Sequence, residues 1–436
     1  MNVAEKLAAL IRFPTVARPE GGEDAAAFSG CRQAILDLYP RVAAACGHRI
    51  VAGRGVVLRW QGREKRASWV LMAHYDVVPA PEPDWEHPPF SGDIAQGYVH
   101  GRGALDTKGT LAAMLQAAEE LLAEGFAPRQ DVFFCFSGDE ETYGPTTGEI
   151  IRYLRENGHT PDFVLDEGGR LTGSPLPGFS GLAALVGVAE KGMAQIVLKA
   201  KGPAGHAARP PRETQADVLV QAMDSVRRNP WPQRLTEPLR ECMHALAGGC
   251  AFPWSLMNQY PESFLGVIFR RFERLAGEAG ALTRTTCALT RLSGGVASNV
   301  LPGEVSAGYN LRLLPGDTPE GAAERMREVI GDPRVTVELT DGNPPSPVSE
   351  TGGEGFGRLR RAVSRVWPGA VTAPFLMTGA TDAYHYSQFC PRVYRFGPLL
   401  ATPEETACVH AANERVSVQA LSDAVLFYKA LLMGEE

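Results

Sequence analysis

The chain has 436 residues, a formal net charge of −7, and contents of 44% hydrophobic and 21% charged residues. This composition is ordinary for a globular protein, and the length predicts two domains. The negative charge argues against nucleic acid or an anionic membrane as the main partner. No apolar run approaches the roughly 18–20 residues that span a bilayer.

Cysteine usage and the N-terminus favour a cytoplasmic location. The eight cysteines are scattered without a CxxC pair, which is typical of reduced thiols in a long chain. The N-terminus, "MNVAEKLAALIRFPTV", places Val3, Leu7, Leu10 and Ile11 at helical spacing with charged residues among them. It predicts an amphipathic helix of the fold, because a signal peptide has a basic start and an unbroken apolar centre.

The first part of the chain alternates between strand and helix patterns. The apolar runs "SWVLMAHYD", "DVFFCFSGDE" and "PDFVLDEGG" predict buried strands. The segment "DTKGTLAAMLQAAEELLAEG" predicts a helix, with Gly125 at the position that follows its C-terminus. Buried strands that alternate with helices indicate an α/β fold, with a mostly parallel central sheet and helices on both faces.

The pattern changes near Gly187. In "GMAQIVLKAKG" apolar and polar residues alternate, which predicts a strand of a half-exposed antiparallel sheet. A helix follows, and "TTCALTRLSGG" and "EVSAGYNLRLL" predict further strands. We therefore expect a smaller α+β domain at 187–307, inserted into an α/β domain formed by 1–186 and 308–436. Residues 229–284 show no readable pattern.

Polar side chains of metal-binding types follow the predicted strands of the first domain. In open α/β sheets, ligands bind beyond the carboxyl ends of the strands, so these side chains are expected to converge. The residues are His74, Asp76, Asp106, Glu140, Glu141, Asp166 and Glu167.

Such a group of carboxylates needs compensating positive charge. A pair of divalent metal ions would supply it, and the histidine favours zinc over magnesium or calcium. Asp76 is close enough to His74 to accept the second ring N–H and fix its tautomer. Glu140 and Glu141 point in different directions if the backbone is extended, so that one can bind metal while the other acts as a base.

Each residue also has an ordinary explanation. A single histidine after a strand is usually a core or loop residue, the acidic run at 139–141 could be a solvated loop, and Asp106 could cap a helix. The joint occurrence of these residues at successive strand ends favours the metal site.

Nine motifs in order give the chain a resemblance to a known family. They are "MAHYDVVP", "GRGALDTKG", "SGDEE", "LDEGG", "GPAGHAARP", "SNVLPGE", "LRLLPGDT", "TGATDAYHY" and "VHAANERV". The chain resembles, essentially end to end, the co-catalytic dizinc exopeptidases, which include aminoacylases, carboxypeptidase S-like enzymes, desuccinylases and related dipeptidases.

The resemblance implies two Zn²⁺ per chain, with Co²⁺ or Mn²⁺ as alternatives. It places His74 and Asp166 on one zinc, Glu141 and His410 on the other, and Asp106 between them. Glu140 is then the general base, and Asp76 orients His74. Because the ligand position of Asp166 holds Glu in some branches and Asp in others, the aspartate suggests the aminoacylase and carboxypeptidase S branch.

The resemblance also makes the inserted domain a lid. His206 would stabilise the oxyanion, and Asn299, Arg312 and the backbone at Gly379 would hold the substrate. The planar fork of Arg312 suits a carboxylate. Alternatively, His206 is an ordinary surface histidine and Arg312 forms a simple salt bridge. Asp382 and His385 are expected to be supporting residues and not ligands. Some relatives dimerise through the lid, so a homodimer is expected.

The expected reaction is hydrolysis of an amide bond by a zinc-activated water with Glu140 as base. The substrate would be a small molecule, either an N-acyl amino acid or a short peptide cleaved at its C-terminal bond. A dipeptidase or a succinyl-amino-acid desuccinylase would use the same metal site. A catalytically inactive binding or scaffold protein of the same fold is the alternative from another class.

Overall fold

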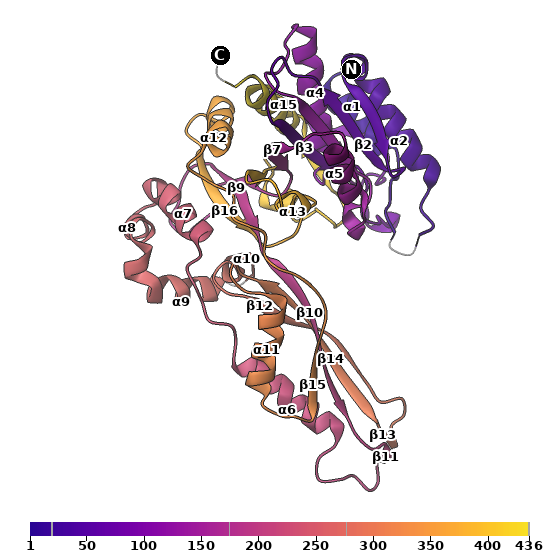
Figure 1. The fold of residues 1–436 in the computed structure, drawn as a ribbon, viewed down its shortest axis with the longest axis vertical. Coiled ribbons are helices and arrows are strands. Elements are labelled where there is room, and N and C mark those ends of the chain that lie inside the picture. The colour runs from indigo at the N-terminus through magenta and orange to yellow at the C-terminus, as the bar shows by residue number, and fades with distance from the viewer. Residues whose placement is uncertain (19–20, 174, 276, 435–436) are drawn as a thin grey trace.

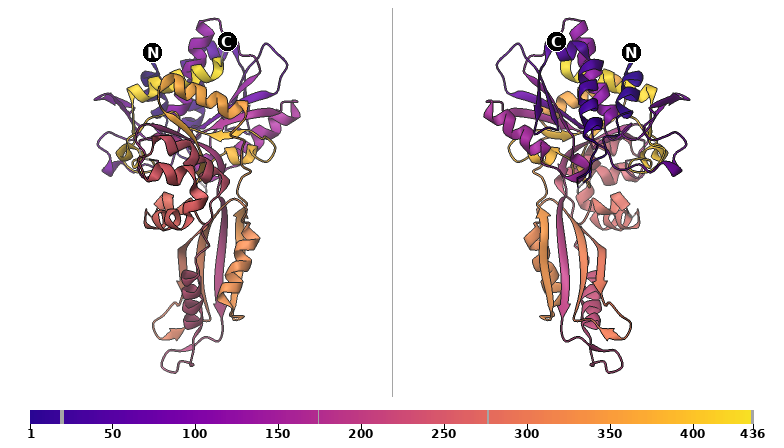
Figure 2. Two further views of the ribbon diagram at one scale, coloured as in Figure 1. Left: turned by 90° about the vertical axis from the view of Figure 1, so that its left-hand side faces the viewer. Right: turned by 90° about the vertical axis from the view of Figure 1, so that its right-hand side faces the viewer.

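The computed structural model describes residues 1–18, 21–173, 175–275 and 277–434. The chain forms a main α/β body, which contains both termini, and an elongated lid that extends from it (Figure 1). Figure 2 shows the lid from its two sides as a narrow slab standing clear of the main body. The predicted fold class is confirmed, because a mixed sheet with a parallel core is accompanied by a separate antiparallel sheet.

The main sheet has the strand order β1-β2-β6-β3-β7-β17-β9-β16, and β8 pairs with β9. Strands β6, β3, β7 and β17 run parallel to one another, as do β9 and β16. The other pairings are antiparallel. The strands are β1 Gly47–Val51, β2 Gly55–Trp60, β3 Ser68–His74, β6 Val132–Ser137, β7 Pro161–Asp166, β8 Arg170–Thr172, β9 Ala183–Glu190, β16 Val371–Met377 and β17 Val393–Arg395. A small separate sheet contains β4 Asp93–Ala95, β5 Tyr98–His100 and β18 Arg415–Ser417.

Helices cover both faces of the main sheet. Neighbouring strand residues point to opposite faces, so Leu71 and Phe134 pack in one core while Val70 and Phe133 pack in the other. The first core is covered by α1 Val3–Ile11, α2 Ala25–Leu38, α3 Pro40–Ala45, α4 Lys108–Ala123, α12 Glu354–Val366 and α15 Val418–Met433. The second is covered by α5 Thr146–Glu156 and α13 Ala383–Tyr386. The short helix α14 Pro403–Thr406 precedes β18.

The lid is an antiparallel sheet of order β12-β14-β10-β15 with two helices on one face. Along β10 the buried residues Ala194, Ile196 and Leu198 alternate with partly exposed ones, as the sequence pattern predicts. The buried set packs against the helices. The elements are β10 Gly192–Lys201, β12 Thr286–Gly294, β14 Glu304–Leu313, β15 Val335–Asn343, α6 Gln215–Arg228 and α11 Pro319–Ile330. At the far end of the lid, β11 Gly205–His206 pairs with β13 Val300–Leu301.

The lid is longer than the sequence pattern indicates. The expected boundary at 186/187 falls inside β9, and the one at 307/308 falls inside β14. Strands β14 and β15 complete the lid sheet, and α11 covers its core. The pattern after Gly316 is correctly helical, but an amphipathic helix does not reveal which sheet it covers.

Residues 229–284 have no readable pattern, and the structure describes four α-helices among them, which are α7 Glu237–Leu246, α8 Trp254–Gln259, α9 Leu265–Leu275 and α10 Gly277–Ala281. Leu239 and Met243 of α7 share a core with Phe375 of β16, the last strand of the main sheet. This helical segment therefore flanks the main body rather than the lid sheet. No helix in the described part of the chain is long and apolar enough to cross a membrane.

Candidate metal centre

The carboxyl edge of the parallel core brings together the side chains that follow its strands. His74 is the last residue of β3, Glu140 and Glu141 begin a 3-10 turn (Glu140–Thr142) just after β6, and Glu167 directly follows β7. Asp106 lies in the loop before α4. Because β6, β3 and β7 are adjacent and parallel, these residues meet at one edge, as expected for this type of sheet.

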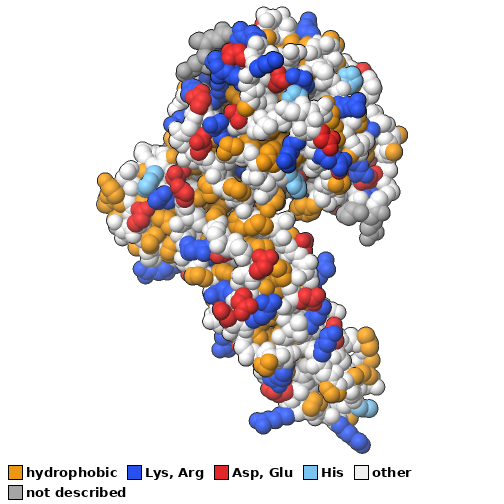
Figure 3. Space-filling model, viewed as in Figure 1, with side chains coloured by type: hydrophobic (Ala, Val, Ile, Leu, Met, Phe, Trp, Pro, Cys, Tyr) orange, Lys and Arg blue, Asp and Glu red, His pale blue; other side chains and the backbone are white. Residues whose placement is uncertain are grey.

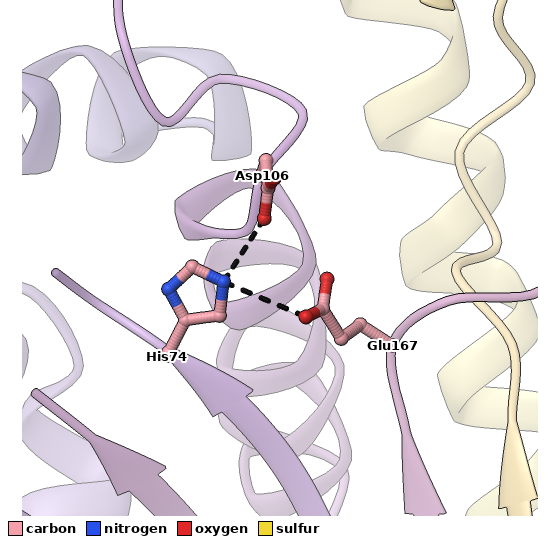
Figure 4. A group of neighbouring side chains, drawn as sticks. All are labelled: His74, Asp106 and Glu167. Carbon is pink, nitrogen blue, oxygen red and sulfur yellow. Dashed lines mark hydrogen bonds and ion pairs between the residues drawn. The ribbon is translucent and has the colours of Figure 1, made fainter. Parts of the chain in front are cut away.

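The first group of possible ligands consists of His74, Asp106 and Glu167 (Figure 4). Nε2 of His74 is 2.9 Å from Oδ1 of Asp106 and 3.6 Å from Oε1 of Glu167. Glu140 lies beside this group, with its Oε2 3.9 Å from the same nitrogen. The three side chains point toward a common space, so their donor atoms can share one ion.

The second group consists of Asp106, Glu141 and His410. Nε2 of His410 is 3.0 Å from Oδ2 of Asp106 and 3.2 Å from Oε1 of Glu141. Asp106 thus offers one oxygen to each group, which is the arrangement of a carboxylate that bridges two metals. His410 has a φ of 60°, in the left-handed region that a residue with a side chain seldom adopts.

The structure does not bring Asp166 into either group, and Glu167 occupies the predicted place beside His74. The Asp166 carboxylate accepts the backbone N–H of Ala383 at 2.8 Å and that of Glu167 at 2.9 Å. Burial and the nearby Asp382 raise the pKa of Asp166 to about 7. Successive residues of an extended chain point in opposite directions, so only one of the pair can face His74. The branch preference inferred from an aspartate at this position loses its basis.

Asp76 has the contacts of a residue that orients His74. Nδ1 of His74 lies 3.0 Å from the backbone oxygen of Asp76 and 3.4 Å from its Oδ1. Oδ2 of the same, fully buried carboxylate accepts the N–H of Glu141 at 3.1 Å. Two acceptors at Nδ1 place the proton there, which leaves the lone pair of Nε2 for a metal.

Glu414 holds the loop that carries Asp106. Its buried carboxylate accepts the N–H groups of Gly103, Leu105 and Asp106 at 3.0, 2.8 and 3.1 Å. It also pairs with the buried Arg102 at 2.6 Å. Sequence reasoning did not identify Glu414, although it lies in the "VHAANERV" motif, because a single charged residue gives no sign of its burial.

The shifted pKa values of the centre reflect an excess of carboxylates over positively charged groups. Burial and neighbouring carboxylates raise the pKa of Glu140 to about 10 and that of Glu167 to about 8. Hydrogen bonds to Asp106 and Glu141 raise the pKa of His410 to about 10. The pKa of Asp106 lies below its usual range in spite of burial, because both histidines bond to it. Two imidazoles and surrounding carboxylates form a donor set that fits two divalent metal ions such as zinc, whose charge would take the place of these protons.

Two of the predicted residues, His206 and Asn299, lie at the far end of the lid (Figure 1). His206 is on β11, and the carbonyl of Asn299, which precedes β13, accepts the N–H of Ala207 at 3.0 Å. Both side chains are exposed. Within one chain in this conformation, they are remote from the metal ligands.

The other predicted substrate residues lie where the lid joins the main body. Arg312 on β14 lines a cavity of about 390 Å³ together with Ala380, Thr381 and His385. Gly379 precedes these residues in the exposed turn after β16. On the face drawn in Figure 3, acidic and basic side chains are interspersed over both bodies.

Asp382 is a supporting residue, as the sequence predicts. Its carboxylate accepts the hydroxyl groups of Ser137 at 2.5 Å and Thr147 at 2.7 Å. These bonds join the turn after β16 to the end of β6 and the start of α5, and Asp382 is not a member of either ligand group.

Comparisons with known proteins agree on one family. The family model described as peptidase family M20/M25/M40 matches residues 70–434. The chain is 33% identical to N-fatty-acyl-amino acid synthase/hydrolase PM20D1 of Homo sapiens, over 99% of this chain and 87% of that protein. It is 32% identical to probable carboxypeptidase S-like 2 of Dictyostelium discoideum, over 100% of this chain and 85% of that protein. The crystal structure of the M20 family metallo-carboxypeptidase Sso-CP2 from Sulfolobus solfataricus has the same fold, with a TM-score of 0.67, 17% identity and coverage of 99% of this chain and 98% of that one.

Proposed function

Since the chain belongs to peptidase family M20/M25/M40, a family of metallohydrolases that act on C–N bonds, we propose that it hydrolyses the amide bond of N-acyl amino acids with two zinc ions. The observation that carries this proposal is the position of Asp106. It lies between the His74–Glu167 group and the Glu141–His410 group, with one oxygen toward each.

The relatives and a cavity at the junction of the lid and the main body support the proposed substrate class. The similar human protein is named as an N-fatty-acyl-amino acid synthase/hydrolase, and the Dictyostelium protein as carboxypeptidase S-like. An N-acyl amino acid and a peptide C-terminus both carry a carboxylate close to the scissile amide. Arg312 offers the planar fork that suits such a group. Cleavage of a C-terminal peptide bond is therefore the second candidate activity.

The residues of the chain have distinct parts in the proposed reaction. Bound zinc supplies positive charge for the developing oxyanion and makes a bound water acidic. Glu140 is outside both ligand groups yet adjoins His74, so its carboxylate is free to take the proton of the attacking water. The same carboxyl group then returns the proton to the leaving nitrogen. Asp76 holds the His74 ring in the tautomer that binds metal.

We further propose that two copies associate through the lid. Strand β12 is an edge strand with its backbone unpaired on one side, and its Leu292 is 63% exposed. On the nearby α6, Val220 is 62% exposed, and a cavity of about 590 Å³ lies between this helix and β12. An apolar groove beside an open sheet edge suits pairing with a second copy of the same surface.

The test of function combines metal analysis with a substrate panel. We expect two zinc ions per chain, loss of activity on chelation, and recovery when zinc is returned. We also expect N-acyl amino acids to be hydrolysed faster than dipeptides or succinylated amino acids. Faster cleavage of dipeptides would favour a dipeptidase, and absence of hydrolysis of any substrate by the zinc-loaded protein would favour a binding role.

A further inference from the structure

We infer that the cavity at the junction of lid and main body selects the amino-acid side chain of the substrate. Gln195, Asn310 and Asp341 would recognise a long side chain that ends in hydrogen-bond donors and carries no negative charge, such as that of glutamine or lysine. The inference rests on the proposed function, because the recognised group is the amino-acid part of an N-acyl amino acid.

The register of the lid sheet places these three residues in one row. Gln195 on β10 pairs with Asn310 on β14 on one side and with Asp341 on β15 on the other. Directly paired residues have Cβ atoms about 4.5–5.5 Å apart, so the three polar ends lie side by side. The adjacent row on the same face contains Arg312 and Asn343, one on each side of Met193.

Both rows face away from the lid helices. The neighbours of Gln195 and Asn310 along their strands, Ala194 and Leu311, are fully buried in the helix-covered core. Alternation along the strands then turns Gln195 and Asn310 to the opposite face. There they line the cavity of about 390 Å³, together with Asp341 and the Arg312 row.

The opposite wall of this cavity belongs to the main body, and one of its residues ends the 3-10 turn that begins with Glu140 and Glu141. It contains Tyr143, which follows Glu141 by two residues, and Thr381 and Tyr384 from the turn after β16. The volume falls in the range of small-molecule sites. Since Tyr143 ends the turn that carries Glu141, we expect the amino-acid part of a bound substrate to lie in this cavity.

The row of Gln195, Asn310 and Asp341 makes no polar side-chain contact with the described residues that would stabilise the fold. Within the part of the chain that the structure describes, the side chains of Gln195, Asn310 and Asp341 form no hydrogen bond or ion pair. Farther along the same face, Lys199 pairs with Glu338 across β10 and β15. Lys201 and Glu304 likewise pair across β10 and β14, whereas Asp341 has no partner among the described residues and lines the cavity.

The chemistry of the two rows fits one class of side chain. Two residues along a strand cover about 6.6–6.8 Å, a distance that the side chain of glutamine or lysine can span. With the substrate carboxylate at Arg312, the end of such a side chain reaches the carboxylate of Asp341 and the two amides. An acidic side chain is repelled by Asp341, and an apolar one leaves the row without partners.

The experiment compares zinc-loaded enzyme on three substrates with one acyl group, joined to glutamine, glutamate or norleucine. We expect kcat/KM for the glutamine compound to exceed the other two values by about tenfold, the size of one charge-assisted hydrogen bond. Asp341→Asn should bring the value for the glutamate compound close to that for glutamine. Asn310→Ala should lower the value for glutamine only.

Glu338→Gln is the matched control, because this carboxylate lies on the same strand and face but outside the cavity. It should leave the order of substrates unchanged. Equal kcat/KM for the three compounds, a preference for norleucine, or an unchanged ratio of glutamine to glutamate in Asp341→Asn would overturn the inference while leaving the proposed function intact. Hydrolysis of none of them, together with no hydrolysis across the wider N-acyl panel, would overturn the proposed function itself.

Discussion

Glu414 accepts the backbone N–H of Asp106 at 3.1 Å, so a residue near the C-terminus holds the backbone of the residue whose carboxylate both ligand groups share. Glu414→Ala leaves the buried Arg102 without its partner. Breaking a buried ion pair from one side costs about 3–5 kcal/mol, and we expect that loss in the free energy of unfolding. Denaturant unfolding of the metal-free protein measures it.

The exposed pair of Glu338 and Lys199 provides a control for Glu414. Glu338→Ala should reduce the free energy of unfolding by less than about 1 kcal/mol, because water screens a surface pair. Equal losses for the two variants would mean that Glu414 has no special part in the fold.

Glu140 and Glu141 are neighbours with different expected roles. Glu140→Ala should keep two zinc ions per chain and lower kcat by about 10²–10⁴, the usual contribution of a general base. Glu141→Ala should lose the zinc held with His410, because Glu141 belongs to that ligand group. Metal content and kcat, measured on the same samples, separate the roles. Substantial turnover by Glu140→Ala would show that another group is the base.

Asp166 and Glu167 form a second contrasting pair. Glu167→Ala should lower the zinc content and weaken zinc binding to His74, whereas Asp166→Asn should keep both ions. Asp166→Asn should instead loosen the turn at Ala383, whose N–H its carboxylate accepts. Equilibrium dialysis against zinc distinguishes the two. Loss of zinc from Asp166→Asn with retention in Glu167→Ala would return the ligand role to Asp166.

The metal-free protein should become less stable as pH rises between about 6.5 and 8. In this range folded Glu140, Glu167 and His410, with pKa values raised to about 10, 8 and 10, keep protons that the unfolded chain has released. The folded state therefore binds more protons, and its stability falls with pH. Bound zinc would replace these protons, so the rise in Tm on adding zinc should grow over the same range. A metal-free Tm that increases with pH would contradict this.

The remoteness of His206 from the metal ligands of its own chain leads to a test of the dimer. If the lid of one copy serves the centre of the other, His206→Ala and Glu140→Ala should each be inactive alone and regain part of the activity when mixed. Activity that stays absent after subunit exchange would favour closure of the lid within one chain. Light scattering should show a dimer at micromolar concentration.

Much of the main body and most of the metal centre could be predicted from the sequence. Buried strands that end in polar residues have a clear signature, and His74, Asp106, Glu140 and Glu141 lie close together, as expected. His410 required the family resemblance, since no local spacing connects it to the other ligands. The choice between Asp166 and Glu167 depends on the direction of each side chain at the end of β7, and residue types alone do not encode it.

The boundaries of the lid are also difficult to predict from residue types alone. The helical pattern of α11 and the alternation of β14 are both visible in the sequence, but the partner of each element is set by packing between distant segments. The helices at 237–281 are short, and Pro253 and Pro261 lie between them, so no long continuous helical pattern marks this segment. Their position against β16 depends on tertiary contacts.

The sharing of Asp106 between ligands from both ends of the sequence has a consequence for biosynthesis. While the chain is being made, His74, Asp106 and Glu141 emerge long before His410 and Glu414, so the nascent protein lacks the last ligand and the anchor of the shared one. A product terminated before His410 would accordingly be inactive. Hydrolytic activity would appear only after the segment with His410 and Glu414 had been synthesised.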